Sequence, residues 1–512
     1  MPIQSLRTRS WQIKPWILAA AIAAMPFAVG AQQAPAADAA AKAQAELVKR
    51  AEGLTEQQVE QSHDMAALSR LGQVYATQND MQRFIWVLKR VGELSPNSGE
   101  LKLQLALAYA KIDDKPHAYD TLIRMQTQGF GYDISKDPRF DAIHGTKVWD
   151  YLVANLNVNA KQFGEGKAAF TLPKGDYLYD ALAWDAKRGD LLVGSVRDGS
   201  IRRVDAHGKV SDFIKPDADN GLWGVDALAV DAAHGKLYAG SSSTAIYQGF
   251  NGDNAGKAGI FEFDLATGKF LKKYVFDAGA GTHRLTALAV AADGKVYAAD
   301  AARKQIFKLE DGKLRDIVNN PKLTRFSALT VSGDGRTLYL ADYALGIFGF
   351  DLATGKAFEV AYDQSRLVLG GIVSMNWFDG TLVVVEDGMV PKRIMRLQLD
   401  KDGRKIASAM PLDVAHAEFA SLSASTIAGD KLYTIVNRQA GLYDDHGVLT
   451  DADKLAPTTI FRSNLRFAWG QSGVSGGAAE IAPDKSGKRK KVDMKPGVPA
   501  PVESKPAAQE KH

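Results

Sequence analysis

The 512-residue chain contains no cysteine. It therefore has no disulfide, no thiolate zinc ligand and no lipid-modified N-terminal cysteine, and packing alone must stabilise the fold. The formal net charge is only +4, with 63 Lys and Arg against 59 Asp and Glu. This balance, with no basic face interleaved with aromatic residues, argues against a nucleic-acid partner. No phosphate-binding glycine loop is present, and the G-x-S-x-G match at Gly473 lies in a low-complexity stretch that offers such a serine no strand and helix.

The N-terminus has the pattern of a secretory leader. Basic residues from Arg7 to Lys14 precede an apolar run over residues 16–27, and small residues lead up to Ala31. This predicts a signal peptide over residues 1–31, cleaved after Ala31. The apolar run is shorter than the roughly 20 residues that span a bilayer. We therefore expect a periplasmic or secreted protein with no integral membrane domain after cleavage.

One phrase recurs six times between residues 179 and 437: an alternating apolar strand, a glycine turn, a second apolar strand ending in a small or acidic residue, and a third strand. Equivalent positions fall 46, 60, 41, 46 and 49 residues apart. Several short strands per unit, at a period of roughly 40–50 residues, predict a mainly β protein with a six-bladed β-propeller and a central channel. The equivalent residues are Leu182, Leu228, Leu288, Leu329, Met375 and Ala424.

The predicted propeller covers residues 163–469. Its first strand, AAFTL from Ala168, is expected to pair with TTIFR from Thr458 to Arg462, which would close the ring and remove its exposed edges. Residues 470–512 are rich in Gly, Ser, Pro and Lys. This composition predicts a disordered basic tail.

A second periodicity precedes the propeller, over residues 63–160, after a linker and first helix over residues 32–62. Leu71 and Tyr75 recur 34 residues later as Leu105 and Tyr109. That spacing equals one tetratricopeptide repeat, so we expect a short α-helical domain of this type. Such helix pairs present a concave surface to a protein partner. The alternative is that they only cap or orient the propeller.

One position at the start of each inner strand is expected to face the channel. Two carboxylates and several hydroxyls converge there, an oxygen-rich set that suits a divalent cation. A bound cation polarises a lactone or ester carbonyl and activates a water molecule. The predicted ligands are Asp180, Asp226 and Ser327, and the other blades place Thr286, Val373 and a residue near Ser423 at this position.

The chain from Leu172 to Arg438 resembles the senescence marker protein 30, gluconolactonase and luciferin-regenerating enzyme group of six-bladed propellers. The likeness is carried by YDALAWDAKRGDLLVGSVRDGSIRRVD, SALTVSGDGRTLYLADY and WFDGTLVVVEDGMVPKRIMRLQLDKDG. It implies hydrolysis of a sugar lactone with one divalent cation, Ca²⁺ or Zn²⁺, held by a Glu, an Asn and an Asp at the positions of Asp180, Ser327 and Val373. Valine neither binds metal nor takes a proton, so we expect this metal site to be lost or replaced. The alternative to a protein with one bound cation is a protein with no cofactor.

Further polar residues are candidates for a rebuilt site. Asp342, Glu386 and Asn437 end the second strands of blades four to six, as Asp300 does in blade three, and they could bind substrate. The alternative is that they bond loop amides, which is the commoner use of such residues.

Two histidines and two arginines precede inner strands. His283 and His416 stand where related propeller lactonases carry a proton-transfer histidine, and the alternative is a loop histidine with a structural role. Arg284 and Arg325 could receive an anionic substrate. The sequence thus favours metal-assisted lactone or ester hydrolysis, with a non-catalytic propeller that binds a ligand in its channel, or a protein through its helical domain, as the alternative.

Overall fold

The computed structural model describes residues 48–49, 51–276, 281–320 and 322–467. The predicted signal peptide, most of the segment 32–62 and the tail 470–512 lie outside the described residues. The chain divides into two compact units, Met1–Gln126 with Asp133–Val153 and Thr127–Tyr132 with Ala154–His512. No helix in the described ranges is long and apolar enough to cross a bilayer.

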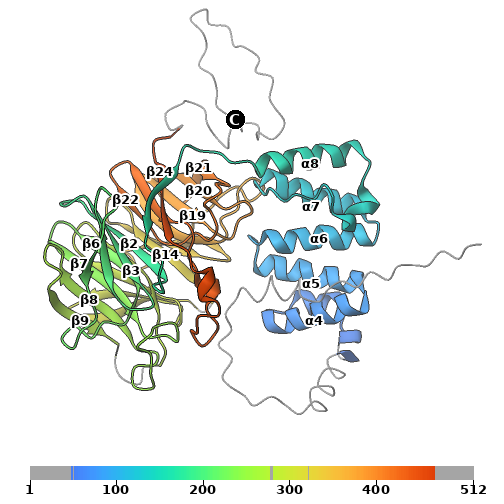
Figure 1. The fold of residues 1–512 in the computed structure, drawn as a ribbon. Helices are drawn as coiled ribbons and strands as arrows, with labels where there is room; N and C mark the ends of the chain where they lie inside the picture. Colours follow the sequence, from blue (N-terminus) through green and yellow to red (C-terminus); the bar gives the residue numbers. More distant parts are fainter. Residues whose placement is uncertain (1–47, 50, 277–280, 321, 468–512) are drawn as a thin grey trace, which may run out of the picture. The chain divides into compact units, whose positions relative to one another are not determined.

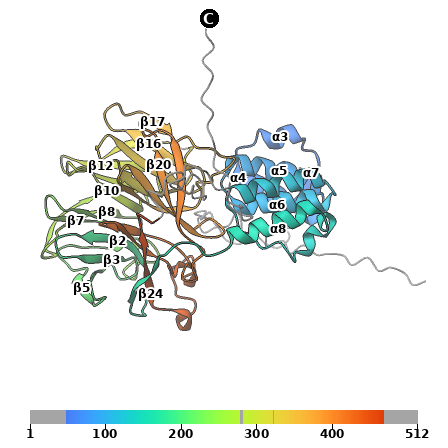
Figure 2. The same cartoon turned by 90° about the horizontal axis from the view of Figure 1, so that it is seen from above.

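The first unit is helical (Figures 1 and 2). Three helices of this unit begin at a capping side chain. Asp64, Asp80 and Ser98 each accept a hydrogen bond from the backbone amide three residues further along the chain. The predicted helical region is thus present, whereas its tetratricopeptide character stays a prediction. The elements are α3 Glu56–Glu60, α4 Met65–Gln78, α5 Met81–Leu94, α6 Gly99–Lys111, α7 Lys115–Thr127, the 3-10 helix η1 Pro138–Ile143 and α8 Lys147–Asn159, which runs into the second unit.

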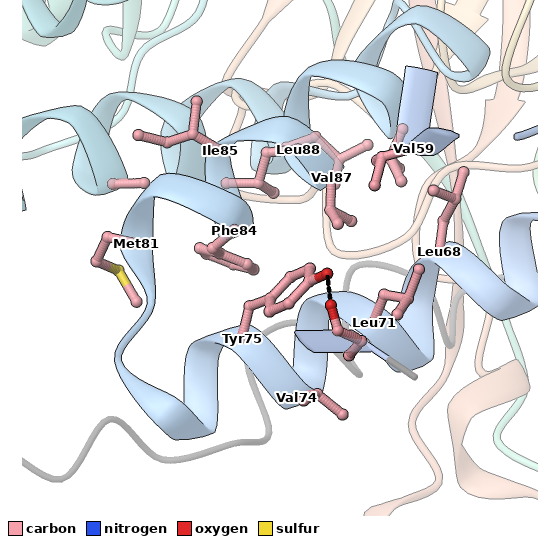
Figure 3. Packing of buried hydrophobic residues seen from close by; sticks show 14 residues of the cluster. Val59, Leu68, Leu71, Val74, Tyr75, Met81, Phe84, Ile85, Val87 and Leu88 are labelled. Atoms are coloured by element: carbon pink, nitrogen blue, oxygen red, sulfur yellow. Dashed lines mark hydrogen bonds between the residues drawn. The ribbon is translucent and has the colours of Figure 1, made fainter. Parts of the chain in front are cut away.

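Apolar side chains from α4 and α5 form the core of the helical unit (Figure 3). Leu68 and Leu88 are fully buried there, because both helices turn their apolar faces to each other. Tyr75 is also buried, and its hydroxyl donates a hydrogen bond of 2.8 Å to the carbonyl of Ala51. This bond satisfies the one polar atom that Tyr75 brings into the core.

The second unit is a six-bladed β-propeller, as predicted. It consists of six four-stranded antiparallel sheets, and in five of them the strands follow each other along the chain. The blades are β2 Tyr179–Asp185, β3 Asp190–Ser195, β4 Ile201–Val204, β5 Val210–Ile214; β6 Gly224–Asp231, β7 Lys236–Ser242, β8 Ala258–Asp264, β9 Phe270–Val275; β10 Leu285–Val290, β11 Val296–Asp300, β12 Gln305–Glu310, β13 Lys313–Asn319; β14 Phe326–Val331, β15 Thr337–Asp342, β16 Gly346–Asp351, β17 Ala357–Glu359; β18 Ile372–Phe378, β19 Thr381–Glu386, β20 Arg393–Leu399, β21 Ile406–Val414; and β22 Ser425–Ala428, β23 Lys431–Ile435 with β24 Thr458–Asn464 and β1 Lys167–Leu172.

The sixth blade joins the two ends of the propeller. Its outer strand β1 pairs with β24 from Lys167 opposite Arg462 to Leu172 opposite Thr458. The predicted pairing of these two segments is confirmed. This pairing closes the ring by joining the two ends of the propeller chain in one blade.

The inner strands β2, β6, β10, β14, β18 and β22 contact one another in turn around the ring. In the first five of them the strand ladder skips one residue near the start, a β-bulge. A bulge leaves its residue unpaired and turns the side chain away from the regular alternation. The skipped residues are those that the sequence places at the channel: Asp180, Asp226, Thr286, Ser327 and Val373.

Candidate functional site

Five charged side chains from five different strands or loops interact at one end of the inner strands. Arg438, which follows β23, places Nη2 2.7 Å from Oδ2 of Asp180 on β2. Arg284, which precedes β10, places Nη2 3.1 Å and Nε 3.3 Å from Oδ1 of Asp226 on β6. Arg325, which precedes β14, is close enough to interact electrostatically with both other arginines and with Asp180. We call these residues the channel cluster.

The two bulges explain why the carboxylates meet. Asp180 and Asp226 are the skipped residues of adjacent inner strands, and each raises the negative potential at the other. Two like charges at this range need a compensating cation. Arg284 and Arg438 supply it from neighbouring blades, so these two ion pairs connect blades one, two, three and six, and Arg325 belongs to blade four.

Burial and neighbouring charges set the protonation of the cluster. Burial raises the pKa of the Asp180 carboxyl, and Asp226 adds to this, while Arg438 and Arg284 act in the opposite direction. Asp226 raises the pKa of the Arg284 guanidinium, so this arginine remains charged. With both carboxylates ionised, the cluster has three positive charges against two negative ones. It therefore carries an excess of positive charge.

Arg325 is the residue in which this excess is concentrated. Among the described residues it forms no ion pair with a carboxylate, and its guanidinium lies 4.6 Å from the ring centre of Tyr343. Its side chain is exposed, yet it lies deep enough that loss of hydration, helped by Arg438 and Arg284, lowers its pKa. An anion beside Arg325 would remove both penalties.

The predicted metal ligands do not fit a divalent cation in this arrangement. Asp180 and Asp226 are each bonded by an arginine, whose charge would repel a cation. The Ser327 hydroxyl donates a 3.2 Å hydrogen bond to the carbonyl of Ala341, and Val373 offers no ligand atom. Within the described ranges, no three His, Asp or Glu side chains are grouped as a metal site would require. The structure thus brings Asp180 and Asp226 together but gives them arginines as partners.

Asp342, predicted to bind substrate, instead bonds its own loops. Its Oδ1 accepts hydrogen bonds from the Thr324 hydroxyl at 2.7 Å and from the amides of Ala344 and Leu345 at 3.0 Å. Its Oδ2 accepts from the amides of Thr324 at 2.6 Å and Arg325 at 3.0 Å. Asp342 is fully buried, so it positions the backbone of Arg325 from beneath.

Glu386 and Asn437, the other predicted substrate ligands, also have internal partners. Glu386 is fully buried and forms an ion pair with Arg393, which also donates a 3.0 Å hydrogen bond to the carbonyl of Val368. Asn437 accepts from the amide of Thr459 at 2.7 Å and donates to the carbonyl of Pro457 at 2.9 Å. Neither side chain bonds a member of the channel cluster.

The two histidines are buried beside carboxylates. His283 Nδ1 lies 2.6 Å from Asp300 Oδ2, and the ring stacks on Phe276 with centroids 3.8 Å apart. His416 Nε2 lies 3.0 Å from Asp413 Oδ1 and 3.0 Å from the carbonyl of Phe163. Both rings are thus fixed by internal contacts, and neither has a contact with the cluster arginines.

Arg438 of the channel cluster and Tyr343, which contacts Arg325, are residues that the sequence did not single out. Arg438 comes directly after Asn437, the residue that ends the second-strand phrase of blade six, at the start of the long connection to the third strand. Tyr343 follows Asp342 at the end of β15. The signal that was present is positional, because both residues follow the last residue of the second-strand phrase.

Comparison with known proteins finds no family model and no curated protein that matches this chain. Solved structures do match. A luciferin-regenerating enzyme is 15% identical over 62% of this chain and 98% of its own, with a TM-score of 0.41. A gluconolactonase from Xanthomonas campestris is 15% identical over 60% and 92%, with a TM-score of 0.40, and an aldose sugar dehydrogenase from Streptomyces coelicolor with bound PQQ is 16% identical over 59% and 98%, with a TM-score of 0.39. At this level the matches decide nothing about activity, and the class of the protein, a six-bladed propeller with a charged channel cluster, follows from its own sheets and side chains.

Proposed function

We propose that the propeller binds a small organic anion at its channel cluster. The observation that supports this most directly is Arg325, an exposed residue with no carboxylate partner among the described residues, beside two further arginines. Guanidinium groups present a planar fork of donors that matches a carboxylate or phosphate. This is the non-catalytic, ligand-binding alternative of the sequence, with Arg284 and Arg325 as its predicted contacts.

The positive excess explains why an anion fits better than a neutral sugar or a cation. Asp226 and Asp180 neutralise Arg284 and Arg438, so one full positive charge remains for the ligand. A partly enclosed channel lowers the effective dielectric constant and strengthens this attraction relative to an exposed surface. The ring of Tyr343 supports the face of the Arg325 guanidinium and leaves its edge for the ligand.

The rival function is metal-assisted hydrolysis of a lactone or ester. It would require Asp180 and Asp226 to exchange their arginine partners for the cation, and Ser327 to release the carbonyl of Ala341. The similarity to a gluconolactonase suggests this reaction but is no evidence that this chain catalyses it. The proposed function requires a bound anion, whereas the rival function requires a bound cation. Unfolding measurements with added ions therefore separate the two.

Thermal unfolding with added ions tests the proposal. Malonate or citrate should raise the melting temperature, since a ligand at 100 times its Kd stabilises the folded state by about 2.7 kcal/mol. Arg325→Gln should remove this shift. The matched control is Arg336→Gln, because Arg336 is an exposed arginine in a turn, with 84% of its side chain accessible.

The same assay contains the outcome that contradicts the proposal. Stabilisation by Ca²⁺ or Zn²⁺, lost in Asp180→Ala, together with hydrolysis in a lactone panel that this substitution abolishes, would establish the rival. A wild-type protein that no anion stabilises would also refute anion binding.

We further propose that the protein acts outside the cytoplasm and that its helical unit binds a protein partner. The first proposal rests on the predicted leader, and the second on the 34-residue spacing of Leu71 and Tyr75 with Leu105 and Tyr109. N-terminal sequencing of the exported protein checks the cleavage after Ala31. Cross-linking of the full chain in its own host checks whether a partner reaches the helices.

A further inference from the structure

Connections between second and third strands differ in length around the ring. In blade two this connection runs over residues 243–257, and in blade six over residues 436–457. In blades three and four it covers only residues 301–304 and 343–345. All of them lie at the end of the second strand, beside the start of the inner strand where the channel cluster is. The two long connections therefore flank blade one, whose own connection covers only residues 196–200, and the rim is low at blades three and four.

The blade-six connection is closed at its base. Asn437 bonds Pro457 and Thr459, and Gln439 donates a 2.9 Å hydrogen bond to the carbonyl of Ala456 and accepts one of 2.7 Å from its amide. Arg438 lies between these two anchoring residues. We call residues 438–457 the blade-six strap. Its base fixes the arginine that pairs with Asp180.

Farther along, the strap is bonded to blades one and two. Arg197, after β3, donates two hydrogen bonds of 2.8 Å to the carboxylate of Asp176, which also accepts one of 2.5 Å from the Tyr443 hydroxyl of the strap. The Nη1 atom of Arg197 donates a hydrogen bond of 3.0 Å to the carbonyl of Gly447 in the strap and one of 2.5 Å to the carbonyl of Ile246 in the blade-two loop. One buried guanidinium thus joins three blades. We call Asp176, Arg197 and Tyr443 the clasp.

The two long loops touch at a glycine. Gly447 has φ of 74°, and a Cβ built on it would lie 2.0 Å from the carbonyl oxygen of Ala245 in the blade-two loop. Real side chains do not approach a backbone atom so closely, so any larger residue at this position must push the loops apart. The chain thus provides a substitution that opens the strap without touching the channel cluster.

Solvent exposure of the channel cluster follows the height of the rim. On the side of the strap, the side chains of Asp180 and Arg438 are 16% and 23% exposed, and that of Asp226 is 2% exposed. On the side of blades three and four, the side chain of Arg284 is 37% exposed, and Arg325 is also an exposed residue. The strapped blades therefore hold the shielded members of the cluster.

We propose that the blade-six strap is a fixed wall that shields Asp180 and Arg438, so that ligands reach the cluster from blades three and four, where Arg325 meets them first. The strap thereby determines the size and orientation of the anion. This inference rests on the proposed function for the nature of the ligand, but not for the route of access.

The test compares two glycine substitutions. Gly447→Ala should open the strap, whereas Gly429→Ala is the matched control, because Gly429 also has positive φ, 61°, and its Cβ would meet no described atom within 4 Å. Hydrogen exchange reports on the loops. Access to each arginine is measured with phenylglyoxal, which modifies guanidinium groups, followed by mass spectrometry of the modified peptides.

The expected result is faster exchange over residues 439–457 and 243–257 in Gly447→Ala and a several-fold rise in modification of Arg438, with Arg325 unchanged. Equal modification of Arg438 in wild type and Gly447→Ala, despite faster exchange, would overturn the proposal. So would unchanged exchange in Gly447→Ala, or the same rise in Gly429→Ala.

Tyr443→Phe provides a second, milder variant in case Gly447→Ala does not fold. It removes only the hydroxyl that binds Asp176, and a smaller rise at Arg438 is expected. A rise confined to regions outside the strap would contradict the clasp. Because this measurement uses no anion, failure of anion binding in the thermal assay leaves its result intact, and the two proposals fail separately.

Discussion

Two sets of aspartates on the same face of the propeller have different partners. Asp180 and Asp226, the skipped residues of inner strands, bond guanidinium groups delivered by other blades. Asp300 and Asp342, at the ends of second strands, bond backbone amides of the loops next to them. A carboxylate bonded by amides fixes the path of a chain, whereas a guanidinium group that bonds a carboxylate has further donors with which it can bind a ligand. The second pair therefore supports the site that the first pair forms.

The largest loss of stability is expected in the second set, which consists of Asp300 and Asp342. Asp342→Ala should destabilise the protein by roughly 3–5 kcal/mol, because buried amides and a hydroxyl lose their shared acceptor. Denaturant unfolding measures this loss. Asp402→Ala, at an exposed turn, is the control and should stay within about 0.5 kcal/mol of wild type. An equally mild Asp342→Ala would mean that its amides find other partners.

A smaller loss is expected in the first set. Asp226→Ala should cost about 1–3 kcal/mol, because it leaves Arg284 without its carboxylate, although partial exposure of that arginine moderates the penalty. The same change should strengthen binding of malonate, since it increases the positive excess. Weaker malonate binding in this variant would show that Asp226 contacts the ligand directly.

The pH dependence of anion binding sharpens the role of Asp180. Because burial raises the pKa of Asp180, protonation removes a negative charge and frees Arg438, so sulfate should bind several-fold more tightly as the pH falls through the pKa of Asp180. Titration calorimetry with sulfate, which stays fully ionised, measures this. Asp180→Asn should abolish the dependence and hold the affinity at its acidic level. A wild-type affinity independent of pH would contradict the assignment.

The same raised pKa has a consequence for stability. The folded state holds the Asp180 proton more tightly than the unfolded chain does. This contribution is complete below the ordinary pKa of aspartate and is lost as the pH rises through the raised value. Asp180→Asn should therefore flatten the pH dependence of the melting temperature in this interval.

The smallest stability change is expected for Arg325→Gln. Arg325 has no carboxylate partner among the described residues and lies near two like charges, so its removal should leave the melting temperature unchanged or slightly higher. The thermal scan without ligand provides this value. A clear drop would indicate that the ring contact with Tyr343 stabilises the fold more than the repulsion destabilises it.

Periodicity made the architecture predictable from the sequence. Each blade repeats the same strand phrase. The sequence therefore predicts the ring, the pairing of β1 with β24, and the positions of Asp180 and Asp226, which are the skipped residues of their strands. These features depend on neighbours along the chain or on the repeat itself. Pattern reasoning is suited to both.

The pairing within the site was not predictable in the same way. Arg438 reaches Asp180 across the junction of blades six and one, from a connection whose length differs from blade to blade. Which cation meets which carboxylate depends on loop path and side-chain length, and neither leaves a periodic signal. A repeat alignment therefore gives the position of the carboxylates but not the arginines that bond them.

The junction of β1 and β24 also determines how the propeller would respond to force. Lys167, where the chain enters the ring, lies opposite Arg462, near the point where it leaves, so both outward ends are at the same end of one antiparallel pair. A pull between these ends would load the pair one hydrogen bond at a time, as in unzipping, instead of shearing all of them together. The ring would then open at blade six, where the two ends of the propeller chain are paired.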